Sequence, residues 1–493
     1  MKVRRLTHIL ILLLSLVILS MVQAVVPPPD GGYPGFTTAE GTNALKNLTT
    51  GVANTGIGWY SLFGTSTGNY NTAVGAGALD LNNADSNTAV GVAALLLNTT
   101  GTNNTANGTA TLVFNDSGEG NTATGAFAMY SNTEGDFNTA NGEFALYFNT
   151  TGARNTALGD SALYLNIEGS RNTAIGNPAL LNNTTGNNNT AVGFNALWAN
   201  TVSDNTAVGA SALSANTTGT NNTASGTEAL SSNTVGAANT AIGYQALVEN
   251  VDGSLNTAVG DIALRNKTTG GQNTAVGGWT LVNNTVGTNN TAIGFSTLFK
   301  STGNGNTALG AYAGASVIGA SNVISIGSSG ADVDDSCYIG NIWQQSGGSQ
   351  AVYVNASGKL GAQVSSRRFK DDIKPMEQSS EVIYQLKPVS FRYKREIEAA
   401  APPGFGLIAE DVDDVNPDLV LRDKKGKPYT VRYDAVNAML LNEFLKEHRT
   451  VQEQQKEIDA LKQELKDQRA LIEKVNARID VDKAPPQLLA DKF

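Results

Sequence analysis

Residues 37–327 repeat a pattern of apolar and polar positions with a period of 16 or 17 residues. The motif Asn-Thr-Ala-Val-Gly recurs from Asn71 onward, and a Leu follows the glycine of each copy by four residues. From Leu45 to Leu298 this column is interrupted by one other residue, Met129, and a small residue, mostly Ala, precedes each member. A column that stays apolar in every copy predicts a continuous buried stripe, in which each copy stacks on its neighbours.

The repeat predicts a mainly β fold, a parallel β-solenoid or β-roll with two short strands and two tight corners in each coil. Its period is too short for a pair of helices, and its Gly, Thr and Asn content disfavours helix. An unbroken glycine column from Gly41 to Gly310 supplies the positive φ angles that corners need. A column of Asn three residues after each Leu, as at Asn82 and Asn98, fits a ladder of stacked amides. The residue before each glycine varies between aliphatic and polar, which indicates a partly buried position.

A core of one Leu and one or two small apolar residues per coil is thin for a single chain. We therefore expect several chains to bury the Leu stripe together, as in a homotrimer. The short glycine-containing repeats resemble the β-roll heads of trimeric autotransporter adhesins, although period and consensus differ. That resemblance implies three entwined or side-by-side chains.

Three functions are compatible with the array. It could be a stalk that separates a tip from a base, an adhesive or glycan-binding surface, or an ice-binding solenoid. A Thr column from Thr38 to Thr307 suits ice, but a flat face with two such columns would be expected. No cluster of residues indicates which host or surface glycan or protein the array would bind.

Near the C-terminus the apolar spacing changes to alternating steps of three and four residues, which predicts a coiled coil over residues 437–480. Ile at a positions with Gln at d positions favours a trimer, and a single long surface helix is the alternative. Pro485 and Pro486 are expected to end the helix and leave residues 481–493 as a tail. The a positions are Asn437, Phe444, Val451, Ile458, Leu465, Ile472 and Ile479, and the d positions are Leu440, Glu447, Gln454, Leu461, Gln468 and Val475.

Residues 1–24 have the pattern of a signal peptide: a basic start, an apolar run over 9–19 and a small-residue exit at Ala24. An uncleaved anchor is the alternative. Residues 25–36 form a linker rich in Pro and Gly, and no later stretch has the roughly 20 apolar residues that cross a bilayer. We expect an exported protein, extracellular or at the cell surface, without a membrane span in the mature chain.

Charge divides the chain at residue 365. Residues 25–364 contain 7 basic residues (Lys and Arg) and 19 acidic residues (Asp and Glu). Residues 365–493 contain 23 basic and 24 acidic residues in little more than a third of that length. Such a change predicts a domain boundary, with residues 328–364 as a connector. The formal net charge of −10 argues against nucleic acid as a partner, because phosphate binding needs clustered Lys and Arg.

One cysteine, Cys337, excludes an internal disulfide framework. We expect it to be a small buried apolar residue. The chain has two His, one of them in the predicted signal peptide, so neither a metal site nor any other cofactor is expected.

Several motifs of residues 365–436 resemble, in order and spacing, the C-terminal intramolecular chaperone domain of phage endosialidase tailspikes and related fibres. The same auto-processing module occurs in a eukaryotic family of membrane-bound transcription factors. The resemblance covers about 120 residues and implies a domain that trimerises, promotes folding of the preceding fibre and then cuts itself off. The motifs are Ser-Ser-Arg-Arg-Phe-Lys from Ser365, Leu386–Tyr393, Gly404–Val412, Pro417–Val420 and Val431–Val436.

The resemblance also implies the site of the cut, between Val364 and Ser365. The family pattern is Ser-Asp-x-Arg-x-Lys, and Ser365, Arg368 and Lys370 match it as nucleophile, supporting arginine and base. Ser366 stands where Asp is usual. A lysine serves as a base when its pKa is depressed, which burial or neighbouring arginines would achieve. The predicted activity is a single-turnover serine self-cleavage. The alternative is an uncleaved trimer in which residues 365–493 remain attached as a permanent C-terminal trimerisation domain, here called the permanent foot.

Overall fold

The computed structural model describes residues 35–267, 269–342, 352–354, 359–361, 364–395, 400–423 and 425–482, with side chains up to residue 479. The predicted signal peptide, most of the linker and the two prolines after the last helix lie outside these residues. The chain divides into two compact units, Met1–Gly347 and Gly348–Phe493. Each unit is described by itself.

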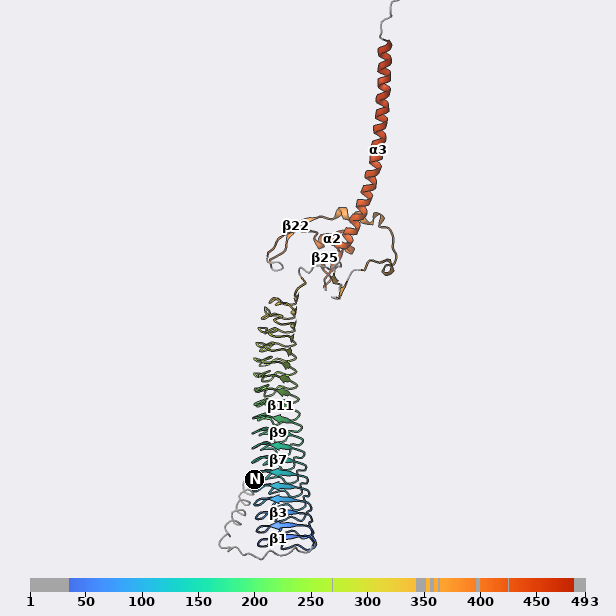
Figure 1. Cartoon of the computed structure of the whole chain (residues 1–493). Helices are drawn as coiled ribbons and strands as arrows, with labels where there is room; N and C mark the ends of the chain where they lie inside the picture. The colour runs from blue at the N-terminus through green and yellow to red at the C-terminus, as the bar shows by residue number, and fades with distance from the viewer. Residues whose placement is uncertain are drawn as a thin grey trace, which may run out of the picture. The chain divides into compact units, whose positions relative to one another are not determined.

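The first unit is a solenoid of about 18 coils whose strands pair in parallel and in register, Thr on Thr and Ala on Ala (Figure 1). This confirms the parallel β-solenoid. The strands are β1 (Thr38–Glu40), β2 (Thr55–Ile57), β3 (Thr72–Val74), β4 (Thr88–Val90), β5 (Thr105–Asn107), β6 (Thr122–Thr124), β7 (Thr139–Asn141), β8 (Thr156–Leu158), β9 (Thr173–Ile175), β10 (Thr190–Val192), β11 (Thr206–Val208), β12 (Thr223–Ser225), β13 (Thr240–Ile242), β14 (Thr257–Val259), β15 (Thr274–Val276), β16 (Thr291–Ile293), β17 (Thr307–Leu309), β18 (Ile324–Ile326) and β19 (Cys337–Ile339).

The expectation of two strands per coil is wrong: each coil of β1–β19 contributes one strand of three residues. The other sides are turns, because several positions of each coil have positive φ. In one coil these are Gly193, Asn195, Leu197 and Asp204, with φ of 135°, 55°, 51° and 65°. Left-handed residues at this density reverse the chain too often for a second extended run.

The glycine of each coil lies where a side chain would collide with the next coil. At Gly142, φ is 145°, and an added Cβ would lie 2.3 Å from the carbonyl oxygen of Gly159. The glycine column therefore serves close backbone stacking as well as positive φ.

The Leu column is a continuous buried stripe, as predicted, and it packs with the Ala that precedes most of these residues and the Ala in the middle of most strands. Leu62, Leu146 and Leu230 have no exposed surface within the single chain. The argument that neighbouring chains must cover this stripe is therefore wrong. Small Ala side chains let the walls of a coil approach closely, so one Leu per coil fills the interior.

Two ladders of buried Asn run through the solenoid. The predicted ladder follows Leu, and here the amide nitrogen of Asn149 donates to the side-chain oxygen of Asn132 at 2.7 Å. The second ladder uses the Asn before each strand: the side-chain oxygen of Asn138 accepts from the backbone N–H of Asn155 at 2.9 Å. Buried amides are stable in this arrangement because each finds partners in adjacent coils.

Lys267 replaces Asn in the first ladder and is fully buried. Its Nζ donates to the side-chain oxygen of Asn284 at 3.0 Å and to the carbonyl oxygen of Gly287. The amine thus points away from Asn250, whose buried side-chain oxygen has no hydrogen-bond partner among the described residues. Burial lowers the pKa of Lys267 from its ordinary value of 10.5 to about 8.

Replacing Lys267 with Asn is expected to stabilise the array, because it supplies a donor to Asn250, and an unsatisfied buried acceptor costs about 1–3 kcal/mol. The gain should shrink as pH rises. Between about pH 8 and 10.5 the unfolded wild type holds more protons than the folded one, so wild-type stability increases across this window. Thermal unfolding near pH 8 and near pH 10 measures both effects. Lys300→Asn makes the same change at an exposed lysine and is the control. The argument would be contradicted if the difference in stability between Lys267→Asn and the wild type were equal at both pH values.

The sheet continues one strand into residues 328–364, which the sequence predicted to be a connector. Strand β19 pairs with β18, with Ile324 opposite Cys337. Cys337 is exposed, so the expectation that it is buried is wrong. A side-chain oxygen of Asp332 accepts from the backbone N–H groups of 318, 319 and 320 at 2.7–2.8 Å, which satisfies donors at this end of the array.

The described residues of the second unit form three two-stranded antiparallel sheets, short helices and one long helix. Its small core consists of Val412, Leu419, Val420 and Val431, with the start of the long helix packed against it. The elements are β20 (Tyr353–Val354), β21 (Leu360–Gly361), η1 (Arg367–Phe369), η2 (Glu377–Gln385), β22 (Val389–Arg392), β23 (Pro403–Gly406), α2 (Ala409–Val415), η3 (Pro417–Leu419), β24 (Val420–Arg422), β25 (Pro428–Val431) and α3 (Tyr433–Asp482).

Candidate functional site

The predicted cut lies just before one turn of 3₁₀ helix, η1. Ser366 caps this turn in an extended conformation, with φ −64° and ψ 141°. The backbone N–H of Phe369 donates to the carbonyl oxygen of Ser366 at 3.0 Å, and that of Lys370 to Arg367 at 3.2 Å. The turn shortens the chain between residues 365 and 370, so that two side chains five positions apart can meet.

Ser365 and Lys370 do meet. Lys370 Nζ donates to Ser365 Oγ across 3.3 Å, slightly longer than the contacts of an assembled catalytic pair. To act as a base, a lysine must be neutral and must accept the proton of the serine hydroxyl.

Both members of the pair are exposed in the single chain, so burial, one of the two features that could prepare the lysine as a base, is absent there. Arg368, the predicted supporting residue, directs its guanidinium over the ring of Phe369, 4.6 Å from the centroid. This contact is a cation–π interaction within the turn. The described contacts of Arg368 therefore fix the shape of η1 and do not reach the serine.

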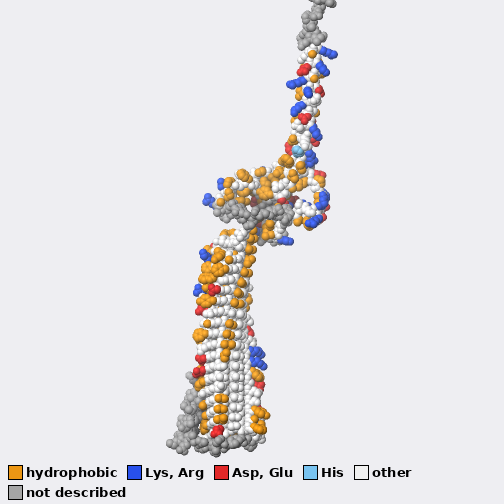
Figure 2. All heavy atoms as spheres, in the orientation of Figure 1, with side chains coloured by type: hydrophobic (Ala, Val, Ile, Leu, Met, Phe, Trp, Pro, Cys, Tyr) orange, Lys and Arg blue, Asp and Glu red, His pale blue; other side chains and the backbone are white. Residues whose placement is uncertain are grey.

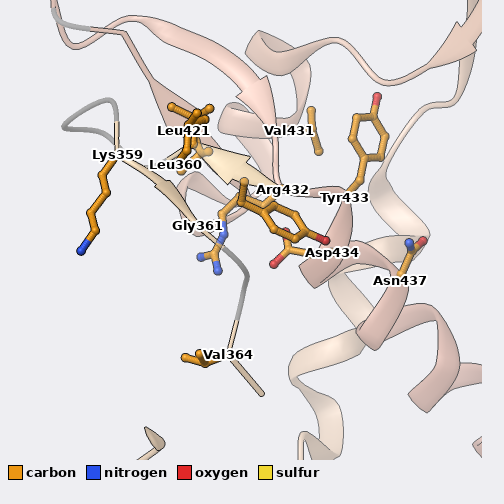
Figure 3. A pocket seen from close by; sticks show the side chains of 12 residues that line it. Lys359, Leu360, Gly361, Val364, Leu421, Val431, Arg432, Tyr433, Asp434 and Asn437 are labelled. Atoms are coloured by element: carbon orange, nitrogen blue, oxygen red, sulfur yellow. The ribbon is translucent and has the colours of Figure 1, made fainter. Parts of the chain in front are cut away.

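A cavity of about 840 Å³ is lined by residues that precede the cut and by residues that follow it in the chain (Figure 3). The β20–β21 hairpin forms one wall, and β24, β25 and the start of α3 form the other. Val364, the residue before the predicted cut, is at its edge. The lining is mixed, with Leu360, Leu421 and Val431 beside Arg432 and Asp434. The hairpin that precedes the cut and the elements that follow it therefore line one cavity within the second unit.

Helix α3 is fastened to η2 by a buried carboxylate that the sequence did not reveal. Glu443 accepts hydrogen bonds from Ser380, from Tyr384 at 2.9 Å and from Lys446 at 2.8 Å. The Lys446 and Ser380 bonds hold the pKa of Glu443 below its usual range, and the bond to Glu443 raises the pKa of Tyr384. Asn442 adds a bond of 2.7 Å to Ser380. In the heptad Glu443 occupies a flanking position, where a charge is ordinary, so the sequence carried no signal of this network.

Beyond this anchor, α3 leaves its apolar heptad positions uncovered in the single chain. Phe444, Ile458, Leu465 and Ile472 at a positions are 66%, 45%, 59% and 57% exposed. Charged side chains flank them along the helix, while the array has few charges on the face shown in Figure 2. An exposed apolar stripe of this length is a candidate interaction surface.

No helix among the described residues is both long and apolar enough to cross a membrane. No group of three or more His, Cys, Asp or Glu side chains in the same part of the chain could hold a metal ion.

Residues 365–421 match the family model described as "Chaperone of endosialidase", also named peptidase S74. The match begins at Ser365 and includes η1, Lys370 and the elements up to β24. A chaperone-of-endosialidase domain therefore follows a β-solenoid, as the sequence motifs suggested, and the pair is typical of a fibre or adhesin-like protein with a trimerisation chaperone. No curated protein and no solved structure matches the chain.

Proposed function

We propose that the protein is an exported homotrimeric surface fibre whose C-terminal domain brings three chains together and is then released by self-cleavage between Val364 and Ser365. The observation that carries this proposal is the contact of 3.3 Å between Lys370 Nζ and Ser365 Oγ at the first residue of the matched domain. The proposal of export rests on the sequence of residues 1–24.

The cleavage follows from the chemistry of the pair. Neutral Lys370 accepts the hydroxyl proton while Ser365 Oγ attacks the carbonyl carbon of Val364. The bond between that carbon and the nitrogen of Ser365 breaks, the nitrogen takes up a proton, and an ester joins Val364 to Ser365 Oγ. Water then hydrolyses the ester, which leaves a carboxylate at Val364 and a free amine at Ser365. Each chain reacts once.

Assembly would supply what the single chain lacks. Desolvation favours the neutral amine, and the exposed apolar stripe of α3 brings three C-terminal units together. Chains that pack around residues 365–370 would exclude water from the pair. Cleavage would then follow trimerisation, so that the domain is not lost before it has acted.

The same assembly gives the domain a role in folding, although each array has its own core. Identical coils pair equally well in shifted registers, and long-range β assembly is slow. Joining three chains at one end raises their local concentration and sets a common register. The chaperone therefore aligns arrays rather than completing their cores.

A permanent trimeric foot is the second candidate. Ser366 in place of the usual Asp and the exposed Ser365–Lys370 pair favour it. An ice- or glycan-binding monomer is the third function considered from the sequence, and the exposed stripe of α3 argues against a monomer.

Intact mass and light scattering on the purified full chain distinguish these candidates. We expect two fragments that meet between Val364 and Ser365, and a C-terminal fragment with the mass of a trimer. One uncut mass with a trimeric assembly would favour the permanent foot. A monomer would contradict both.

A further inference from the structure

One face of the solenoid sheet is apolar, uncharged and exposed. In each strand the middle residue points into the core, and the first and third residues point outward. The third residues of β8–β19 form a column that is aliphatic except at Ser225. Its members are Leu158, Ile175, Val192, Val208, Ser225, Ile242, Val259, Val276, Ile293, Leu309, Ile326 and Ile339.

Most of these aliphatic side chains are exposed, with Val208, Ile242 and Ile293 at 41%, 42% and 42%, and the others are partly exposed. The first residues of the same strands form a second outward column. This column is Thr in β8–β17 and continues with Ile324 in β18 and Cys337 in β19. Neither column of β8–β19 contains a charged residue. The third residues of β5–β7 are polar: Asn107, Thr124 and Asn141. A short aliphatic run at β2–β4 precedes them, so the longest apolar stretch of the column lies in the C-terminal part of the array.

A second copy of this chain fits such a face. Copies that are parallel and joined at their C-terminal ends present the same coil at the same height, so the three identical columns can converge around the axis of the trimer. Uncharged columns avoid the repulsion that like charges would cause in a symmetric contact. A partner with a charged surface would gain nothing from this face.

The face is smaller than a standard protein interface, so we expect it to be buried only between chains that are already joined elsewhere. Twelve strands at about 4.8 Å and two side-chain columns about 7 Å apart give roughly 400 Å² per chain. A standard interface buries about 800 Å² per partner. Chains that are already joined have lost most of their translational freedom, so the smaller face is sufficient for them.

We propose that the arrays of the trimer contact one another through this face, the outward columns of β8–β19. The inference rests on the homotrimer of the proposed function and identifies the surface that the repeats use. Cys337 lies in the outward Thr column of the last strand and is exposed. Its three copies would therefore lie close together at the C-terminal end of the contact.

Cysteine cross-linking tests the contact. The full chain carries Ser365→Ala, to retain the C-terminal domain, and Cys337→Ser, to remove the native thiol. Val208→Cys places a thiol on the face, and Val235→Cys places one outside the sheet at a valine of similar exposure, 50%. A bifunctional maleimide that spans about 10 Å, the spacing of packed sheets, should link most Val208→Cys chains into dimers and few Val235→Cys chains. The native Cys337, tested without its substitution, should also link.

Light scattering on the same samples separates the two proposals. A trimer in which Val208→Cys links no better than Val235→Cys would overturn the contact and leave the trimer intact. Monomers would overturn both. Contact with ice or with an unrelated protein predicts no cross-link at Val208, so that result counts against the proposed contact.

Discussion

Replacing Ser365 with Ala is expected to leave the chain in one piece, without fragments that meet at Val364. The substitution removes the oxygen that would attack the Val364 carbonyl, and no other described side chain forms a hydrogen bond with Lys370 Nζ. Replacing Lys370 with Ala should slow the cut by about 10²–10⁴-fold, the usual effect of removing a general base. Intact mass at successive times after purification measures both rates.

Ser366→Ala is the matched control for this experiment. Ser366 is adjacent to the nucleophile, and its side chain makes no capping hydrogen bond to η1. We expect the control to be cut at the wild-type rate. Persistent cutting of Ser365→Ala at the same bond, or loss of cutting in all three variants, would show that the pair does not act as proposed.

Replacing Leu461 with Asp is expected to convert the trimer to monomers. Leu461 occupies a d position of α3 and is 57% exposed in the single chain, so it is available to a partner helix. Burying one Leu side chain contributes about 1.5–3 kcal/mol, and a trimer would lose three such contributions. Three carboxylates would also meet at the helix interface, where an unpaired buried charge costs several kcal/mol.

Ala460→Asp places the same charge one residue away, at an outward heptad position. We expect this variant to remain trimeric, and light scattering of the full chain compares the two. If Leu461→Asp were still trimeric, the apolar stripe of α3 would not be what joins the chains. If cleavage depends on assembly, Leu461→Asp should also be cut more slowly than Ala460→Asp.

The candidate site was predictable from sequence to the extent that local chain geometry determines it. Ser365 and Lys370 were chosen from their match to a family pattern, and one 3₁₀ turn brings them together. Their exposure was not predictable, because the burial of a lysine depends on what packs over it. The anchor at Glu443 was missed for the same reason: Ser380 and Tyr384 lie about 60 residues earlier in the chain.

The sequence alone determined the features that repeat along the array: the parallel β-solenoid, the buried Leu stripe, the glycine column and the Asn ladder after Leu. A property present in every coil leaves a column in the alignment of repeats. It also predicted the long apolar stripe of residues 437–480, since heptad spacing is local, whereas the trimer and the signal peptide remain predictions.

The tertiary structure decided how each coil closes. Positive φ at Leu197 and its equivalents turns the chain, so that each coil contains one strand. Each coil then closes on itself and buries the Leu stripe within one chain. It also decided which donor faces which acceptor: Lys267 leaves the side-chain oxygen of Asn250 without a partner among the described residues, and Cys337 lies outside the core. Such outcomes depend on contacts between residues about 17 positions apart, and these contacts exist only once the chain has wound into coils.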